Sequence, residues 1–160
     1  MGRLTTYIAV ISLGLVASMV ANADETYFTA TGNEDGKLLI FRSITAVPHG
    51  IEKAQFPNRV NIIWHFDPSN NGMPGAEVNE KQIEFEDAIQ PLNVNDLGRQ
   101  MLVVTGNGRK EWYWYVRDLS ACRSELGQRI ADHTYPITIT SAYDPDWSLC
   151  EDFIAGVKGL

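Results

Sequence analysis

Hydrophobic and polar residues alternate along several short segments, which is the pattern of half-buried β-strands. The alternation is clearest in Arg59–Phe66, where every second side chain is large and apolar. Gln100–Thr105 and Lys110–Val116 flank Asn107-Gly108, a pair that favours the positive φ angles of a type I′ hairpin turn. The remaining predicted strands are Thr26–Thr31 and Leu38–Ile44, joined as a hairpin by Gly32–Gly36, and Ile137–Ala142 after Pro136.

Three further segments repeat their apolar residues at the spacing of an α-helix. Asn79 followed by Gln82 resembles a capping pair and predicts the start of the first helix. Either Asp118 or Ser120 can cap the second helix, because a short polar side chain satisfies the first free backbone amides. The predicted helices cover roughly residues 79–92, 118–133 and 147–157.

The order of these elements predicts an α+β fold. From Arg59 onward the order is strand, helix, strand, strand, helix, strand, which is the split βαβ arrangement called ferredoxin-like. Right-handed crossovers would put both helices on one face of a four-stranded antiparallel sheet. The N-terminal β-hairpin and the C-terminal helix are then additions to a single domain over residues 24–160.

Pairing around Asn107-Gly108 sets which side chains share a face of the sheet. It places Val103 opposite Trp112, Met101 opposite Trp114 and Leu102 opposite Tyr113, so the tryptophans face the helices and belong to the core. The other face is predicted to be open and to bind a partner through Tyr113, Tyr115, His65, Ile63 and Asn61. The alternative is that the N-terminal hairpin folds over this face and makes it a second core.

The first 23 residues have the features of a secretory signal peptide. Arg3 precedes an apolar run from Tyr7 to Val20, and Ala21-Asn22-Ala23 offers the small residues that a signal peptidase accepts. A membrane anchor is the alternative, but the run is shorter than the ~20 apolar residues that a bilayer requires. We therefore expect a periplasmic or secreted protein with no membrane contact after cleavage.

The charge disfavours a nucleic-acid partner. The chain has 13 Lys and Arg against 20 Asp and Glu, a net charge of -7, and without Arg3 the balance is about -8. Affinity for a phosphate backbone comes largely from Lys and Arg that displace counterions, and the sequence contains no basic block. A protein partner, or a second copy of the chain, is expected instead.

The two cysteines each lie on an apolar stripe of a predicted helix. Cys122 shares its stripe with Leu126, and Cys150 shares its stripe with Ile154, so both thiols should point inward. An exported protein reaches an oxidising compartment, which predicts a Cys122–Cys150 disulfide. The alternative is two unpaired thiols that behave as small apolar core residues.

No catalytic, cofactor or metal site is predicted. His49, His65 and His133 lie in separate elements without the spacing of metal ligands, and no serine has a G-x-S-x-G setting. There is no phosphate-binding loop. The acidic residues of the first helix are interpreted as a solvated face, although paired carboxylates can serve acid/base chemistry: Glu77, Glu80, Glu84, Glu86 and Asp87.

One polar cluster is predicted from topology. The turn at Gly106–Lys110 and the turn at Asp144–Trp147 are expected at the same end of the sheet. The residues that would meet there are Arg109, Glu111, Asp144 and Asp146. They form either an ion-pair cluster that holds the last helix or the catalytic end of a small hydrolase.

Four blocks of residues resemble the bacterial domain-of-unknown-function family 695, in the family's order and over about half of the mature chain. They are Asn71-Gly72-Met73-Pro74; Glu84 to Ala88; Thr105 to Trp112 with Tyr115; and Tyr135-Pro136-Ile137 with Asp144 to Trp147 and Phe153. The resemblance implies no established activity or catalytic residue. Some members are joined to a domain similar to a protein regulator of ribonuclease E, an acidic α+β protein. Cys150 stands where the family is expected to have an aromatic residue, a departure that fits an oxidised, exported variant.

Three classes of function follow from these patterns. The leading hypothesis is an exported, non-catalytic binding or protein-interaction module. The alternatives are a regulator or inhibitor of a nuclease or other enzyme, and a small hydrolase that uses the polar cluster. Aromatic residues on the third strand of a split βαβ sheet are also where RNA-recognition folds stack bases, but the negative charge and the predicted export oppose RNA binding.

Overall fold

The computed structural model describes residues 26–94 and 96–158. The predicted signal peptide, residues 1–23, lies outside the described residues. Within residues 26–94 and 96–158, no helix is long and apolar enough to cross a membrane.

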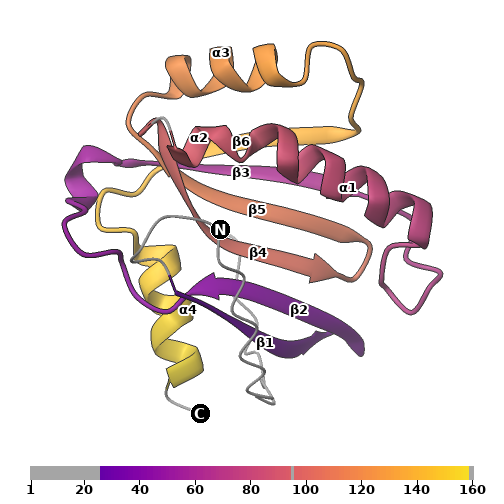
Figure 1. The fold of residues 1–160 in the computed structure, drawn as a ribbon. Coiled ribbons are helices and arrows are strands. Elements are labelled where there is room, and N and C mark those ends of the chain that lie inside the picture. The colour runs from indigo at the N-terminus through magenta and orange to yellow at the C-terminus, as the bar shows by residue number, and fades with distance from the viewer. Residues whose placement is uncertain (1–25, 95, 159–160) are drawn as a thin grey trace.

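The strands form one six-stranded antiparallel sheet in the order β1-β2-β4-β5-β3-β6 (Figure 1). The strands are β1 Tyr27–Glu34, β2 Lys37–Ile44, β3 Asn58–His65, β4 Gly98–Gly106, β5 Arg109–Val116 and β6 Ile137–Tyr143. The helices are the 3-10 turn η1 Lys53–Gln55, α1 Ala76–Ile89, α2 Pro91–Val94, α3 Leu119–Arg129 and α4 Ser148–Lys158. The predicted α+β class and the antiparallel sheet are therefore confirmed.

Helix α1 begins earlier than predicted. Gly75 is its N-cap, and the amide of Asn79 already donates to the Gly75 carbonyl, so Asn79 lies inside the first turn. Gln82 is fully buried and does not cap the helix. Of the two N-caps predicted for α3, Asp118 or Ser120, the structure has Asp118, whose side chain accepts from the Ala121 amide at 2.7 Å.

Both hairpins turn through two residues with positive φ. Asn107 and Gly108 have φ of 48° and 78°, as the sequence predicted. The first hairpin is tighter than the predicted Gly32–Gly36 loop, because β1 continues to Glu34 and only Asp35-Gly36 form the turn.

A β-bulge changes one predicted cross-strand pair. Val103 pairs with Trp112 and Leu102 pairs with Tyr113, as predicted, but Gln100 and not Met101 lies opposite Trp114. Met101 is the extra residue of the bulge, and it packs on the face opposite the tryptophans. Counting residues from the turn gives the correct partners only as far as the bulge, because the extra residue shifts the pairing and the side-chain faces by one position.

The first face of the sheet packs against α1 and α3. Trp112 and Trp114 lie at the centre of this core, as predicted, and Phe85 of α1 contacts Trp112 with ring centroids 5.1 Å apart. The other buried members of this core are Val60, Ile62, Trp64, Ile89, Leu92, Val103, Val116, Cys122 and Leu126.

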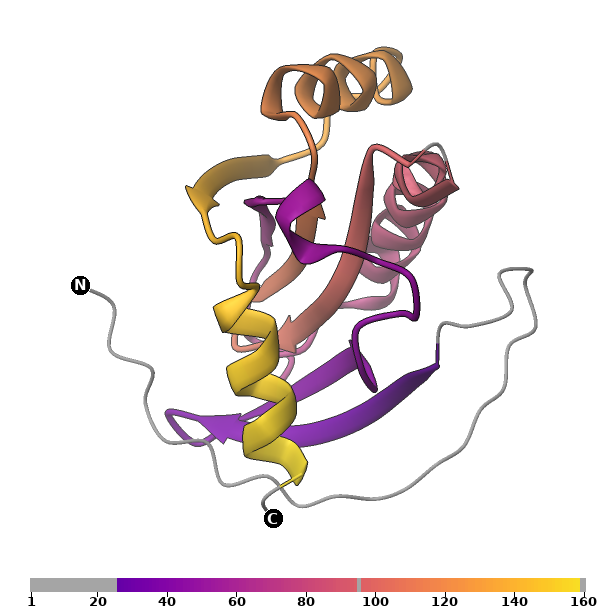
Figure 2. The same cartoon turned by 90° about the vertical axis from the view of Figure 1, so that its left-hand side faces the viewer.

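The second face is covered in part by α4. Figure 2 shows α4 on one side of β4 and β5 and α1 on the other. Trp147, just before α4, is fully buried and stacks on Tyr115 at 4.6 Å, while its Nε1 donates to the Phe56 carbonyl. The N-terminal hairpin does not fold over this face; it extends the sheet beyond β4, and its Phe41 packs against Phe153 of α4.

The two cysteines are free and buried, so the structure does not contain the predicted Cys122–Cys150 disulfide. Cys122 lies in the core between the sheet and α3, whereas Cys150 lies in the core between α4 and the opposite face. The sheet separates the two thiols, because α3 and α4 pack on its two sides.

Both thiols should therefore resist alkylation in the native protein. Burial raises the pKa of Cys122, and burial followed by the nearby Glu151 raises the pKa of Cys150 to about 12, so little thiolate forms at neutral pH. We expect intact-mass measurement after iodoacetamide to find no label in native protein and two labels after denaturation without reductant. An unlabelled pair after denaturation would contradict the free thiols.

Candidate functional site

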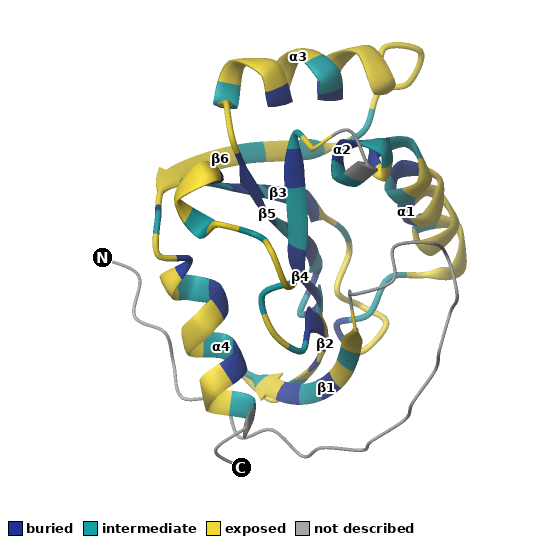
Figure 3. Ribbon diagram, turned by 60° about the vertical axis from the view of Figure 1, so that its left-hand side comes forward, coloured by how far each residue is buried: buried dark blue, intermediate teal, exposed yellow. Residues whose placement is uncertain are grey.

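Helix α4 leaves part of the second face uncovered. The residues concerned lie on β3, β5 and β6 and are half-buried or exposed; together they are named the uncovered strip: Arg59, Asn61, Ile63, His65, Tyr113, Thr138 and Thr140. Figure 3 shows that β6, at this edge of the sheet, is largely exposed. The strip combines ring, amide, hydroxyl and guanidinium groups on a rigid sheet.

Four of the five residues predicted to bind a partner lie on this strip. Asn61, Ile63 and Tyr113 are half-buried there, and His65 is exposed at the end of β3. The prediction that Tyr115 is exposed is wrong. Its ring is fully buried beneath Trp147, because α4 packs over the end of β5 that carries it.

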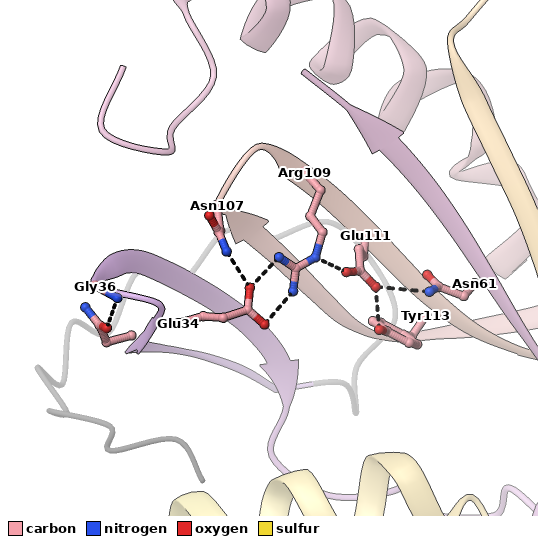
Figure 4. Close-up of polar contacts among 8 residues, drawn as sticks. Glu34, Gly36, Asn61, Asn107, Arg109, Glu111 and Tyr113 are labelled. Atoms are coloured by element: carbon pink, nitrogen blue, oxygen red, sulfur yellow. Dashed lines mark hydrogen bonds and ion pairs between the residues drawn. The ribbon is translucent and has the colours of Figure 1, made fainter. Parts of the chain in front are cut away.

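A hydrogen-bonded ion network lies beside the strip, where the first hairpin meets β5 (Figure 4). Arg109, the first residue of β5, binds the Glu34 carboxylate with both terminal nitrogens, Nη2 at 3.1 Å from Oε1. Asn107 Nδ2 donates to the same carboxylate at 2.9 Å. The bidentate pair fixes the tip of β1 against β5, three strands away in the sheet order.

Glu111 is the second carboxylate of this network and is only 7% exposed. It accepts from Arg109 Nε, from the Tyr113 hydroxyl at 2.5 Å and from Asn61 Nδ2 at 3.0 Å. Three donors on one buried carboxylate compensate the loss of its hydration. The network therefore joins the strip to β1 through a continuous chain of polar contacts.

The electrostatics of the network shift the pKa of Glu34 and of Tyr113 in opposite directions. Hydrogen bonds from Arg109 lower the pKa of Glu34, against the opposing effect of burial. Burial, and then the Glu111 carboxylate, raise the pKa of Tyr113 well above its ordinary value. Tyr113 is thus a neutral hydrogen-bond donor near pH 7 and is poorly suited to accept a proton in acid/base chemistry.

The predicted four-residue polar cluster does not form. Arg109 and Glu111 lie at the start of β5, whereas Asp144 follows the end of β6. Strands β5 and β6 both run antiparallel to β3, so they point the same way and these two positions are at opposite ends of the sheet. Asp146 is exposed in the turn beyond Asp144.

Asp144 instead holds the start of α4. Its Oδ1 accepts from the Ser148 amide at 2.8 Å, and its Oδ2 accepts from the Leu149 amide at 3.3 Å and from the Tyr115 hydroxyl at 2.7 Å. Arg59 Nη1 lies 3.6 Å from the same carboxylate. A carboxylate at the first turn of a helix satisfies free amides and interacts favourably with the helix dipole.

Replacing Asp144 by Ala should lower the free energy of unfolding at pH 7 by about 2–3 kcal/mol, because α4 loses its cap and Tyr115 keeps a buried, unpaired hydroxyl. Burial alone would raise the pKa of Asp144, but the hydrogen bonds from Tyr115, Ser148 and Leu149 lower it below its ordinary value. Its contribution is therefore present above the unfolded pKa, about 3.9, and is lost as the pH falls through the folded pKa.

Urea denaturation at several pH values checks this prediction. The difference between wild type and Asp144→Ala should shrink as the pH falls below about 4. Asp146→Ala is the matched control and should stay within about 0.5 kcal/mol of wild type, because Asp146 is exposed. Equal losses for the two variants would contradict the role assigned to Asp144.

A second ion network lies on the first face and involves the acidic helix. Glu86 Oε1 accepts from Trp112 Nε1 at 2.7 Å and from Lys110 Nζ at 2.9 Å, with Arg42 at 3.5 Å. Lys110 is only 8% exposed. The interpretation of the whole acidic run as a solvated face is wrong for Glu86, while its other carboxylates are exposed: Glu77, Glu80, Glu84 and Asp87.

A cleft of about 420 Å³ opens between α1 and the segment before β6. Tyr135 forms part of its wall and carries His133 stacked on its ring at 5.5 Å. The other lining residues are Trp64, His65, Phe66, Asp67, Val78, Lys81, Glu84, Thr134 and Pro136. Among the described residues, no group of three or more His, Cys, Asp and Glu side chains is arranged to hold a metal ion.

Sequence reasoning missed Glu34, Asn107 and the cleft. Glu34 is 75 residues from Arg109 in the chain, and only the shape of the sheet brings their side chains together. The sequence placed Asn107 in the hairpin turn and so predicted its backbone angles. It did not predict the hydrogen bond that the Asn107 side chain donates to Glu34.

Comparison with known proteins identifies one match. The model of a family described as "Family of unknown function (DUF695)" matches residues 26–155. Neither the curated proteins nor the solved structures contain a match.

Two of the blocks that resemble this family meet at the ion network. The Gly108 amide donates to the Gly72 carbonyl at 3.0 Å. A side chain at Gly72 would lie 3.1 Å from the Asn107 nitrogen, and its φ of +84° favours glycine. These blocks therefore have a structural role that brings the loop after β3 against the β4–β5 turn.

Proposed function

The chain belongs to the DUF695 family of unknown function, and from that premise we propose that it is an exported, non-catalytic protein-interaction module. The observation that carries the proposal is the uncovered strip, whose residues on β3, β5 and β6 are half-buried or exposed. At its margin Tyr113 packs against the core that contains Leu102 and Val104. Its contact residues are Tyr113, Ile63, Asn61 and His65. Tyrosine suits an interface because its ring contributes buried area while its hydroxyl remains hydrogen-bonded.

The ion network supports binding more than catalysis. The Glu111 carboxylate is saturated by three donors, and Tyr113 is held protonated. A preorganised polar network costs little further ordering when a partner binds, which favours recognition. The hydrolase alternative loses its basis, because Arg109 and Asp144 lie at opposite ends of the sheet. A regulator or inhibitor of another enzyme remains compatible with the proposal, as one kind of protein partner.

We infer in addition that the inner part of the fold follows the ferredoxin-like plan. The order β4-β5-β3-β6, with α1 and α3 packed on the same core, supports that plan. The hairpin β1–β2 and the helix α4 are then additions to the ferredoxin-like unit. Helix α4 covers part of the sheet face that this unit would leave open, so that the uncovered strip remains. Export rests on the sequence of residues 1–23.

A photo-crosslinking experiment tests the binding role. A photoreactive phenylalanine derivative is placed at His65, on the strip, or at Ala131, an exposed control position after α3, in cells that make the full chain. The proposal predicts a defined protein adduct at position 65 that is absent at position 131. Absence of an adduct at position 65, or the same adducts at both positions, would contradict it.

A further inference from the structure

The edge strand β6 lacks the features that usually protect a sheet edge. It pairs with β3 and with no other described strand, and most of its residues are exposed. Its sequence, Ile137-Thr138-Ile139-Thr140-Ser141-Ala142-Tyr143, contains no charge, proline or glycine and is rich in β-branched residues. Natural proteins usually blunt an exposed edge with charge, proline or a bulge, because a bare edge pairs with other strands.

The orientation of the backbone groups follows from one hydrogen bond. The Asp144 amide donates to the Pro57 carbonyl at 2.8 Å, so position 144 points its backbone toward β3. Because these directions alternate along an antiparallel strand, Ala142, Thr140 and Thr138 also point toward β3. The backbone groups of Tyr143, Ser141 and Ile139 therefore point away from the sheet, while the outward amide of Ile137 already donates to the Tyr135 carbonyl.

We propose that β6 pairs with β6 of a second copy of the chain, antiparallel about a two-fold axis at Thr140. In this register Ile139 and Ser141 of the two copies exchange backbone hydrogen bonds, and Thr140 faces Thr140 as a non-hydrogen-bonded pair. The two sheets then continue into each other. The pairing rests on the proposed interaction role and uses the outward backbone groups of β6, the strand that carries Thr138 and Thr140 of the uncovered strip; the strip residues on β3 and β5 take no part in it.

Self-complementarity favours a second copy over a different protein. Tyr143 is 76% exposed and lies on the same face as Ile137, which packs partly against the core. The two-fold register places each Tyr143 ring beside Ile137 of the other copy, so each copy covers an apolar side chain of the other. The chain carries a net charge of -7, but β6 adds no charge to the contact and therefore no like-charge repulsion within it.

Analytical ultracentrifugation of the purified mature chain tests the pairing. Wild type should sediment as a reversible dimer at micromolar concentration. Thr140→Lys and Thr140→Glu should each weaken association by roughly 5- to 10-fold, because like charges would face each other at the axis. An equimolar mixture of the two variants should regain the dimer. Thr29→Lys, exposed on the other edge strand β1, is the matched control and should leave the dimer unchanged.

Amide hydrogen exchange shows whether the dimer forms through β6, because association at another surface would not protect the outward amides of this strand. The amides of Ile139, Ser141 and Tyr143 should gain protection as the protein concentration rises, whereas those of Thr138, Thr140 and Ala142 are protected throughout. A monomeric wild type, or a dimer that persists equally in both charged variants, overturns the pairing. These experiments use the isolated chain and test only the β6 pairing. The proposed function is tested separately, because it is overturned by the absence of a crosslinked adduct at position 65.

Discussion

Tyr115→Ser is expected to lower the free energy of unfolding by about 3–5 kcal/mol, the range for removing a large ring from a packed core. Tyr115 is fully buried, its ring stacks on Trp147, and its hydroxyl donates to Asp144. The substitution would leave a cavity under α4 and remove a donor from a buried carboxylate. Because small domains have about 5–15 kcal/mol in total, the variant should be close to unfolding at 37 °C.

Chemical denaturation followed by tryptophan fluorescence measures this loss of stability. Two further variants separate the contribution of the hydroxyl from that of the buried ring. Tyr115→Phe keeps the ring and should cost only about 1–2 kcal/mol for the hydrogen bond to Asp144. Tyr113→Ser, on the uncovered strip, should cost clearly less than Tyr115→Ser because Tyr113 is half-buried. If Tyr113→Ser proved the more damaging of the two, the assignment of Tyr115 to the core would be incorrect.

Arg109→Ala should cost about 3 kcal/mol of stability at pH 7, since it leaves Glu34 and Glu111 without their shared cation. The estimate lies at the low end for buried ion pairs because the Arg109 and Glu34 side chains are each 22% exposed. The tip of the first hairpin should also loosen, which amide exchange in Glu34–Lys37 would report. Urea denaturation provides the free energy, and Arg42→Ala is the control, since Arg42 forms a longer and more exposed ion pair.

The pH dependence gives this prediction a second test. Arg109 lowers the pKa of Glu34, so the pair contributes stability above the unfolded carboxylate pKa and loses it as the pH falls through the folded value. The deficit of Arg109→Ala should therefore be largest near neutral pH and shrink below about pH 4. A deficit that stays constant over this range would mean that packing, and not charge, accounts for the role of Arg109.

The ion network also fixes the positions of side chains on the uncovered strip. Arg109 and Glu111 hold Tyr113 and Asn61 in fixed positions on the sheet, so the strip is preorganised. The proposed binding role predicts that loss of the network weakens partner contact at the strip together with stability. The Thr140 variants change an exposed residue at the β6 edge of the strip and should leave the stability of the monomer nearly unchanged.

The sequence by itself determined the features that depend on neighbours in the chain. Alternation in Arg59–Phe66 predicted β3, Asn107-Gly108 predicted the hairpin turn, and Asp118 predicted the start of α3, because each acts within a few residues. The same local rule paired Leu102 with Tyr113 correctly, since both lie close to the turn. The resemblance to family 695, read from four short blocks, was also confirmed.

Tertiary structure decided everything that depends on how distant segments meet. The bulge at Met101 reversed the face of one core residue, and the docking of α4 buried Tyr115. The shared direction of β5 and β6 separated Arg109 from Asp144, and the sheet itself separated Cys122 from Cys150. No spacing rule contains this information, because strand direction, sheet curvature and helix docking are set by burial of apolar area over the whole chain, which no single segment specifies.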